Sequence, residues 1–334
     1  MREQYFELTA PDIRCTLCDT GASIARLRVR DAHGDFIDVA LPPESLPAGA
    51  PAPGMAGRTI GPCCGRVRGG EALIDGKKYR LTQNEGPNHL HGGLHGCATG
   101  RWAVREASSA RALFQYELPD GLDGYPGNRA LFAEYTVADG ALRVVYSATT
   151  DAPTWLDMTN HVYWDLSGRF DGSAMDQTLE IAASGVVFND AAHLPQAILE
   201  LDDAFDFSMP CALSDKLAAH PEHPQLNNAR GFNNAYVLDP ERARALGFSA
   251  RLRSPRSGIT MTLTTDQPAI VLYSGGYLGE NVRLAVRPGA ACPGCAIALE
   301  AQGLPDPFHL PGARPALVSP GDGYRREIIW RFEA

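Results

Sequence analysis

The sequence predicts a nearly all-β protein with very little helix. Apolar and polar residues alternate in short runs along the whole chain, and 34 glycines and 25 prolines separate these runs. Alternation with a period of two is typical of half-buried antiparallel strands. Helical signals are few and short, so we expect large antiparallel sheets to form the protein.

The individual elements follow in chain order. The alternating apolar faces are Ala25, Leu27 and Val29; Leu131, Ala133, Tyr135 and Val137; Leu142, Val144, Tyr146 and Ala148; Ile259, Met261 and Leu263; and Ile328, Trp330 and Phe332. Two short helices are expected, one at 214–219 with an N-cap-like serine and one at 240–246 that begins with a proline in its first turn.

Residues 41–57 are rich in proline, glycine and alanine and resemble a linker between domains. Only about 40 residues precede this segment, which is too few for an independent hydrophobic core. We therefore expect residues 1–334 to form a single domain.

Composition narrows the class of partner. The formal net charge of −9 and the isoelectric point near 5.5 argue against nucleic acid and against an anionic membrane surface. The first 15 residues contain no apolar signal region, and no apolar run is long enough to cross a bilayer. We expect a cytoplasmic protein that binds a small neutral ligand.

Eight cysteines occur, and four of them form the Cys-x-x-Cys pairs Cys15/Cys18 and Cys292/Cys295. Zinc binding is one interpretation of such pairs. The first pair lies in a strand-like run, where residues three apart face opposite ways, and this argues against a shared metal. Free thiols are the simpler expectation.

The segment 84–96 concentrates His89, His91 and His95 beside paired glycines. Three interpretations are open: a turn whose histidines bond the backbone, a metal site, or an imidazole that moves protons in a site for a sugar or other polyol. If the segment is an extended strand, His89 and His91 share a face.

Polar groups that could take part in catalysis or binding occur in four further segments. His161 lies among aromatic residues. Glu300 ends an apolar run, which would place its carboxylate in a partly desolvated environment. Such burial raises the pKa of a carboxyl group and makes it a better base. Asn233, Asn234 and Arg66 add groups that bind hydroxyls with fixed geometry.

Together these segments resemble the aldose 1-epimerase family over nearly the whole chain. The matching motifs follow in family order: GRVRGGEALIDGKKYRL, NHLHGG, GYPGN, ATTDAPTWLDMTNHVYWDLSG, GFNNAYVLD, QPAIVLYSGGYL, LEAQGLPD and SPGDGY. Each motif is weak alone, but so many in register make the resemblance specific.

The resemblance implies a β-supersandwich of large antiparallel sheets, similar to galactose mutarotase, with its site in an open groove. It implies interconversion of the α and β anomers of an aldose without cofactor or metal. On the matching positions, Glu300 becomes the base that removes the C1 hydroxyl proton and His161 the acid that protonates the ring oxygen. Arg66, His91 and Asn233 become sugar-binding residues.

The chain departs from the family pattern at three places. Asn233-Asn234 replaces the usual Asp-His, Gly65 replaces an asparagine before the arginine, and Trp164-Asp165 replaces Phe-Asn. These changes leave the preferred aldose open. A hexose-phosphate 1-epimerase of the same fold and a non-catalytic sugar-binding relative are the alternatives, and we expect a monomer or homodimer.

Overall fold

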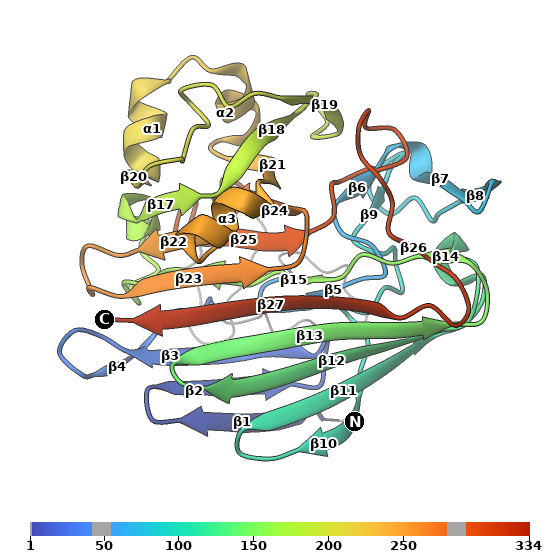
Figure 1. The fold of residues 1–334 in the computed structure, drawn as a ribbon, viewed down its shortest axis with the longest axis horizontal. Coiled ribbons are helices and arrows are strands. Elements are labelled where there is room, and N and C mark those ends of the chain that lie inside the picture. The colour runs from blue at the N-terminus through green and yellow to red at the C-terminus, as the bar shows by residue number, and fades with distance from the viewer. Residues whose placement is uncertain (1, 42–54, 279–291) are drawn as a thin grey trace.

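The computed structural model describes residues 2–41, 55–278 and 292–334. Most of the linker-like segment at 41–57 therefore lies outside the described residues. The described chain is mostly β-strand with little helix, and its strands pair antiparallel in large sheets, as predicted (Figure 1).

A large curved sheet and a smaller one pack face to face. Within the described residues, the large sheet has nine strands in the order β10 (Ala103–Ala107), β11 (Arg111–Leu118), β12 (Arg129–Ala138), β13 (Ala141–Thr150), β27 (Tyr324–Glu333), β23 (Thr260–Thr265), β22 (Ala250–Arg253), β17 (Thr178–Ile181) and β20 (Cys211–Ala212). Strands β1 (Tyr5–Ala10), β2 (Ile13–Cys18), β3 (Ser23–Arg30) and β4 (Phe36–Asp38) form the sheet that covers β11 to β13.

A third sheet carries most of the candidate site. Its described strands run in the order β16 (Tyr163–Trp164), β25 (Ile297–Gln302), β24 (Ala269–Tyr273), β21 (Asn233–Leu238), β18 (Ala183–Asn189) and β19 (Pro195–Leu199). Short ribbons flank it: β14 (Thr154–Trp155) with β26 (Leu317–Val318), β15 (Thr159–Asn160) with β5 (Thr59–Ile60), β6 (Arg66–Val67) with β9 (His89–Leu90), and β7 (Glu71–Ile74) with β8 (Lys77–Arg80).

The helices are short, and two of the three described α-helices lie together at the top of the view in Figure 1. Both predicted helices are confirmed, as α1 (Leu213–Ala219) and α3 (Pro240–Leu246), but the N-cap of α1 is Ala212, so the predicted serine cap is wrong. Asp239 caps α3 by accepting hydrogen bonds from two backbone N–H groups of its first turn. The unpredicted helix α2 (Pro224–Ala229) is capped by the side chain of His223, which is not a typical capping residue.

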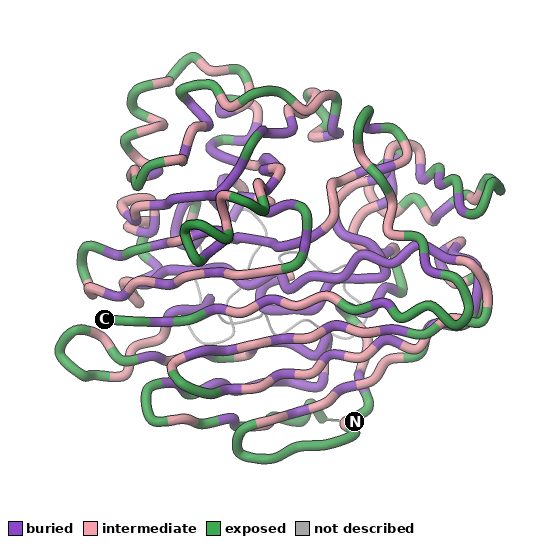
Figure 2. The backbone as a smooth tube through the Cα atoms, in the orientation of Figure 1, coloured by how far each residue is buried: buried purple, intermediate pink, exposed green. Residues whose placement is uncertain are grey.

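The predicted alternation appears in the pattern of burial along the strands (Figure 2). All the apolar residues predicted for β12, β13, β23 and β27 are buried. The largest core cluster extends from Leu8 to Phe332. Trp330 of the nine-stranded sheet and Trp164 of the six-stranded sheet have ring centroids 5.6 Å apart, so this core joins the two sheets.

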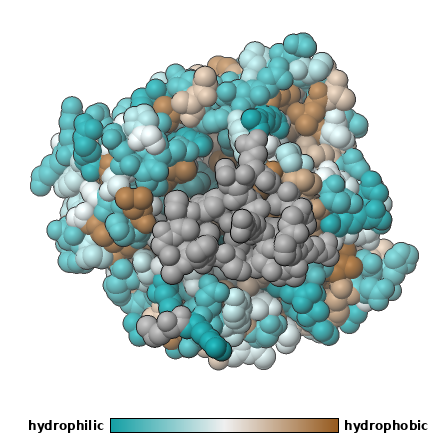
Figure 3. Space-filling view, turned by 180° about the vertical axis from the view of Figure 1, so that it is seen from behind, coloured by the Kyte–Doolittle hydropathy of each residue, from teal (hydrophilic) through white to brown (hydrophobic). Residues whose placement is uncertain are grey.

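The outer surface is mostly hydrophilic, and apolar residues show as small separate patches on the face in Figure 3. The described exposed large apolar side chains include Met209, Leu94, Tyr5 and Leu73. Among the helices of the described ranges, none has the length and apolar content that a bilayer crossing requires.

Candidate active site

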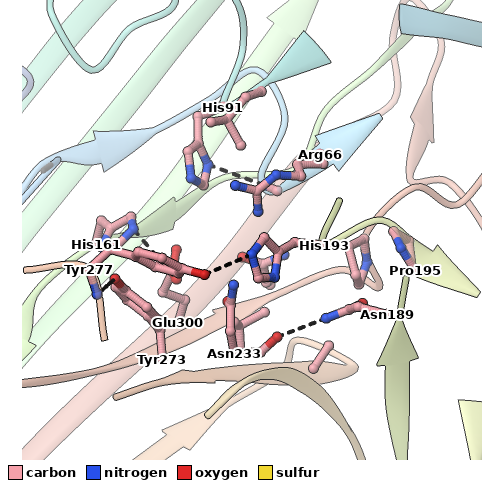
Figure 4. A pocket seen from close by; sticks show the side chains of 16 residues that line it. Arg66, His91, His161, Asn189, His193, Pro195, Asn233, Tyr273, Tyr277 and Glu300 are labelled. Carbon is pink, nitrogen blue, oxygen red and sulfur yellow. Dashed lines mark hydrogen bonds and ion pairs between the residues drawn. The ribbon is translucent and has the colours of Figure 1, made fainter. Parts of the chain in front are cut away.

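All five residues predicted for the site line one cavity of about 320 Å³. The cavity lies over one face of the six-stranded sheet, and the ribbon of β6 and β9 forms part of its wall (Figure 4). The predicted residues are Arg66, His91, His161, Asn233 and Glu300. The fold thus brings together side chains that are separated by up to 234 positions in the sequence.

Alternate residues of two central strands form the floor of this cavity. Glu300 and Gln302 of β25 face it, together with Val271 and Tyr273 of β24, whereas the intervening Ala301 lies in the core. Strand pairing sets Glu300 directly opposite Val271. The carboxylate therefore lies beside an apolar side chain, which contributes to its desolvation.

Asn233 begins β21 and pairs with Tyr273 on the neighbouring strand β24. Its strand lies two inter-strand spacings, about 9.5 Å, from the strand of Glu300. The backbone carbonyl of Asn233 accepts a hydrogen bond of 2.8 Å from Asn189 Nδ2. No residue of the described ranges hydrogen-bonds its side-chain amide, so this amide is available to a ligand on the side of the floor away from Glu300.

His161 approaches Glu300 from the segment between β15 and β16. The Nε2 atom of His161 lies 3.7 Å from Oε1 of Glu300, and the two residues are only 7% and 4% exposed. The Nδ1 atom of His161 and the Oε2 atom of Glu300 are buried without a hydrogen-bond partner among the described residues. Buried polar atoms of this kind are typical of groups that bond a ligand.

Burial shifts the pKa values of this pair in opposite directions. It raises the pKa of Glu300 to about 8, an effect that the Arg66 charge opposes and the Asp157 charge reinforces. It lowers the pKa of His161 to about 4. Each group therefore favours its neutral form, and the pair can take one proton from a ligand while giving it another.

Arg66 approaches the cavity from β6 and is paired with Glu85. The Nε and Nη2 atoms of Arg66 donate to the two carboxylate oxygens of Glu85 at 2.7 and 2.8 Å. This two-point contact fixes the plane of the guanidinium group. It leaves Nη1 of Arg66 available to a ligand and neutralises much of the local positive charge.

His91 is oriented by a backbone contact. Its Nδ1 atom accepts a hydrogen bond of 3.2 Å from the N–H of Gly65, so a neutral His91 carries its proton on Nε2. Burial, followed by the nearby His161 and Arg66, holds the pKa of His91 well below its usual value. His91 is therefore a neutral donor beside His161, whose ring centroid lies 5.5 Å away.

The prediction that His89 and His91 share a strand face is wrong. Strand β9 ends at Leu90, and His91 adopts a left-handed backbone with φ of 49°. A Cβ atom at Gly92 would lie 2.2 Å from the carbonyl oxygen of Gly61, so the chain turns where only glycine fits. Because of this turn, the side chain of His91 faces the cavity, whereas that of His89 does not.

His89 and His95 have other surroundings. The ring of His89 bonds the carbonyl oxygen of Thr82 and the hydroxyl of Tyr125, and it is fully buried. The side chain of His95 is 66% exposed, 3.5 Å from Asp123. The described ranges contain no group of three His, Cys, Asp or Glu side chains arranged to hold a metal ion, and all eight cysteines are free thiols.

Five polar residues of the cavity were not predicted from the sequence. Gln302 lies two positions after Glu300, so alternation along the strand is a signal that could have identified it. The other four reach the cavity through strand order and turns that the sequence does not reveal; they are Asn189, His193, Tyr273 and Tyr277.

The chain is similar to known proteins over almost its full length. A family model described as aldose 1-epimerase matches residues 4–331. Galactose mutarotase from Sus scrofa is 30% identical over 98% of this chain and 94% of its own length. Aldose 1-epimerase from Escherichia coli (strain K12) is 27% identical over 96% of this chain and 92% of its own.

Solved structures show the same architecture. An aldose epimerase homologue from C. elegans superposes with a TM-score of 0.87 and 27% identity, covering 99% of both chains. Galactose 1-epimerase from Lactobacillus acidophilus superposes with a TM-score of 0.82 and 24% identity over 100% of this chain and 99% of its own, and this second likeness concerns the fold alone.

Proposed function

This chain belongs to the aldose 1-epimerase family, and from that membership we propose that its cavity interconverts the α and β anomers of a free aldose. The observation that carries the proposal is the buried pair of Glu300 and His161 on the cavity floor. Opening the ring of a cyclic hemiacetal requires one proton to leave and another to arrive on nearby atoms, and this pair can serve both.

In the proposed mechanism, the ionised carboxylate of Glu300 takes the proton from the C1 hydroxyl group. The imidazolium form of His161 gives a proton to the ring oxygen as the bond between C1 and that oxygen breaks. The aldehyde then rotates about the bond between C1 and C2. The ring closes on the other face by the reverse proton transfers, so both groups return to their starting states.

Positioning would come from the surrounding polar groups. Nη1 of Arg66 and the Nε2 proton of His91 are donors close to the reacting pair, and they would stabilise negative charge that develops on the sugar oxygens. Asn233 would bind hydroxyls on the far side of the ring. The mechanism uses side chains of this chain alone.

The charge of the cavity favours a free sugar over a sugar phosphate. Among the described residues that line the cavity, Arg66 is the only lysine or arginine, and Glu85 neutralises much of its charge. A dianionic phosphate requires more positive charge than this. A purely sugar-binding protein would not need the buried pair of Glu300 and His161, whose desolvation is costly.

Polarimetry tests the proposal directly. The optical rotation of fresh α-D-galactose, α-D-glucose and L-arabinose should relax faster with the protein than in the same buffer alone. The protein should accelerate the mutarotation of glucose 6-phosphate much less. The matched control is the Glu300→Gln protein at equal concentration. Rates equal to spontaneous mutarotation for every free sugar would disprove the proposal. The cytoplasmic location and the monomeric or homodimeric state stay predictions from the sequence.

A further inference from the structure

His193 and Tyr277 are among the polar cavity residues that have no role in the proposed mechanism. His193 lies in the turn between β18 and β19, and Tyr277 follows β24. Figure 4 shows the tyrosine hydroxyl pointing to the imidazole across the cavity. Both residues are joined to Asn228, which lies in α2.

The three residues form a closed ring of hydrogen bonds that runs in one direction. Tyr277 Oη donates to the backbone carbonyl of Asn228 at 2.8 Å. Nδ2 of Asn228 donates to Nδ1 of His193 at 3.4 Å, so a neutral His193 carries its proton on Nε2. That Nε2 atom lies 3.3 Å from Tyr277 Oη and donates to it. The phenolic oxygen therefore keeps acceptor capacity for a ligand.

The backbone of His193 supports a functional role for this ring. Its φ of 59° is in the left-handed region, which is energetically unfavourable for a non-glycine residue. Asp190 Oδ1 holds the turn by accepting from the N–H groups of Ala192 and Leu194 at 2.9 and 3.0 Å. Residues held in such conformations concentrate at ligand sites.

Two further contacts restrain Tyr277. Its backbone N–H donates to the hydroxyl of Tyr273 at 3.0 Å, and the guanidinium carbon of Arg230 lies 4.8 Å from the centre of its ring. A hydroxyl group restrained from several directions loses little freedom when it binds a ligand, so it can discriminate strongly between substrates.

We propose that Tyr277 is a specificity-determining residue, whose phenolic oxygen accepts a hydrogen bond from one aldose hydroxyl other than that on C1. The inference rests on the proposed function and names a contact within the same site. Asn233 supplies only one side-chain acceptor to the far side of the floor, and Tyr277 supplies a second neutral one. The long contact of 3.3 Å between His193 and Tyr277 lets a sugar hydroxyl accept from the former while it donates to the latter.

The experiment removes the proposed hydrogen bond in two ways, by deleting the sugar hydroxyl and by deleting the hydroxyl of Tyr277. Dissociation constants and kcat/KM are measured for D-glucose and its 2-deoxy, 3-deoxy, 4-deoxy and 6-deoxy forms, with the wild type and with Tyr277→Phe. At one position, loss of the sugar hydroxyl should weaken wild-type binding about threefold to tenfold. Tyr277→Phe should weaken D-glucose binding by a similar factor, and the two losses together should cost no more than one alone.

Losses that multiply at all four positions would overturn the inference, because Tyr277 would then affect binding only through the protein structure and not through a hydrogen bond to the sugar. Tyr79→Phe, on the β8 strand outside the cavity, is the matched control and should leave every ratio unchanged. His193→Gln provides a second variant, which should reduce the coupling at the same sugar position. Calorimetric dissociation constants test the contact without turnover, so an inactive wild type would refute the proposed function and still leave this contact to be judged.

Discussion

Oε1 of Glu300 lies 3.7 Å from Nε2 of His161, and both side chains are almost completely removed from solvent. Burial is the main cause of both pKa shifts, upward to about 8 for Glu300 and downward to about 4 for His161. Between these values the pair holds one proton, and that proton lies on Glu300, because each group favours its neutral form. The proposed reaction needs the other arrangement, in which the proton is on His161.

This arrangement predicts a plateau in the pH dependence of kcat/KM. The singly protonated pair dominates between pH 4 and pH 8, and a constant fraction of it has the ionised carboxylate and the imidazolium that catalysis needs. Activity should fall above pH 8, where the shared proton is lost, and below pH 4, where a second proton binds. Initial rates by polarimetry, corrected for the buffer rate at each pH, measure this profile.

A different profile would contradict the assignment. If only the ionised carboxylate were needed, and the proton for the ring oxygen came from water, kcat/KM would rise through pH 8 to a plateau above pH 9. If neither group took part, the corrected rate would show no change near pH 8.

Glu300→Gln should abolish most of the catalysis while leaving sugar binding within about an order of magnitude. Glutamine keeps the size of the side chain and loses the base, and a general base contributes roughly 10²–10⁴ in rate. Polarimetric kcat and calorimetric binding separate the two effects. Glu117→Gln, on an exposed position of β11, is the control. A Glu300→Gln kcat above a tenth of the wild-type value would exclude the proposed base.

The same variant should be more stable than the wild type at high pH. The pKa of Glu300 is about 8 in the folded protein against 4.5 for an ordinary glutamate, so the folded state binds the extra proton between these values. The free energy of unfolding of the wild type therefore falls as pH rises from about 4.5 to 8, and glutamine removes this loss.

Thermal unfolding checks this stability effect. The Tm of Glu300→Gln should exceed that of the wild type by about 2 °C or more at pH 9, and the difference should shrink toward pH 4.5. Equal Tm differences at both pH values would mean that ionisation of Glu300 is not responsible.

The histidines of segment 84–96 should separate into three classes. His91→Ala should raise KM or lower kcat, because His91 faces the reacting pair. His95→Ala should change neither, since its side chain is largely exposed. His89→Ala should mainly lower Tm, because it removes two buried hydrogen bonds. Steady-state kinetics and thermal unfolding on all three variants give the comparison, and equal losses of activity would favour a shared metal site instead.

The elements of the fold were largely predictable from the sequence. A strand that is buried on one face shows apolar residues at every second position, and this pattern can be recognised without knowing the tertiary structure. Strands β12, β13, β23 and β27 have buried faces at the predicted positions. Helix α2 was not predicted, since His223 is an unusual cap. The shared face of His89 and His91 was predicted wrongly, because one left-handed residue redirects the chain and alternation does not report it.

The motifs in family order predicted which residues would lie together, whereas their catalytic and binding roles stay predictions. Arg66, His91, His161, Asn233 and Glu300 line one cavity as expected from that order. His193 and Tyr277 belong to the same cavity for a different reason. Their strands are brought together by the lateral order β24, β21, β18 and β19, which is not the order of the sequence.

The last prediction concerns Asn233, where family members usually have aspartate. A carboxylate at this position accepts hydrogen bonds from two sugar hydroxyls, and such charge-assisted bonds contribute about 1.5–3 kcal/mol against about 0.5–1.5 kcal/mol for neutral ones. The side-chain amide of Asn233 has one acceptor atom and one donor atom. Asn233→Asp should therefore lower KM for galactose and glucose roughly tenfold, since about 1.4 kcal/mol is a factor of ten.

Steady-state kinetics on several aldoses distinguish the outcomes for Asn233→Asp, with Asn234→Asp as the comparison. Asn234 lies on the opposite face of β21, where its amide bonds the carbonyl oxygen of Val187 inside the protein, so its replacement should alter stability rather than relative KM values. Lower activity of Asn233→Asp on every sugar would mean that the amide is fitted to a different hydroxyl pattern. An unchanged KM for all of them would show that Asn233 does not touch the sugar, and the far side of the floor would then belong to His193 and Tyr277 alone.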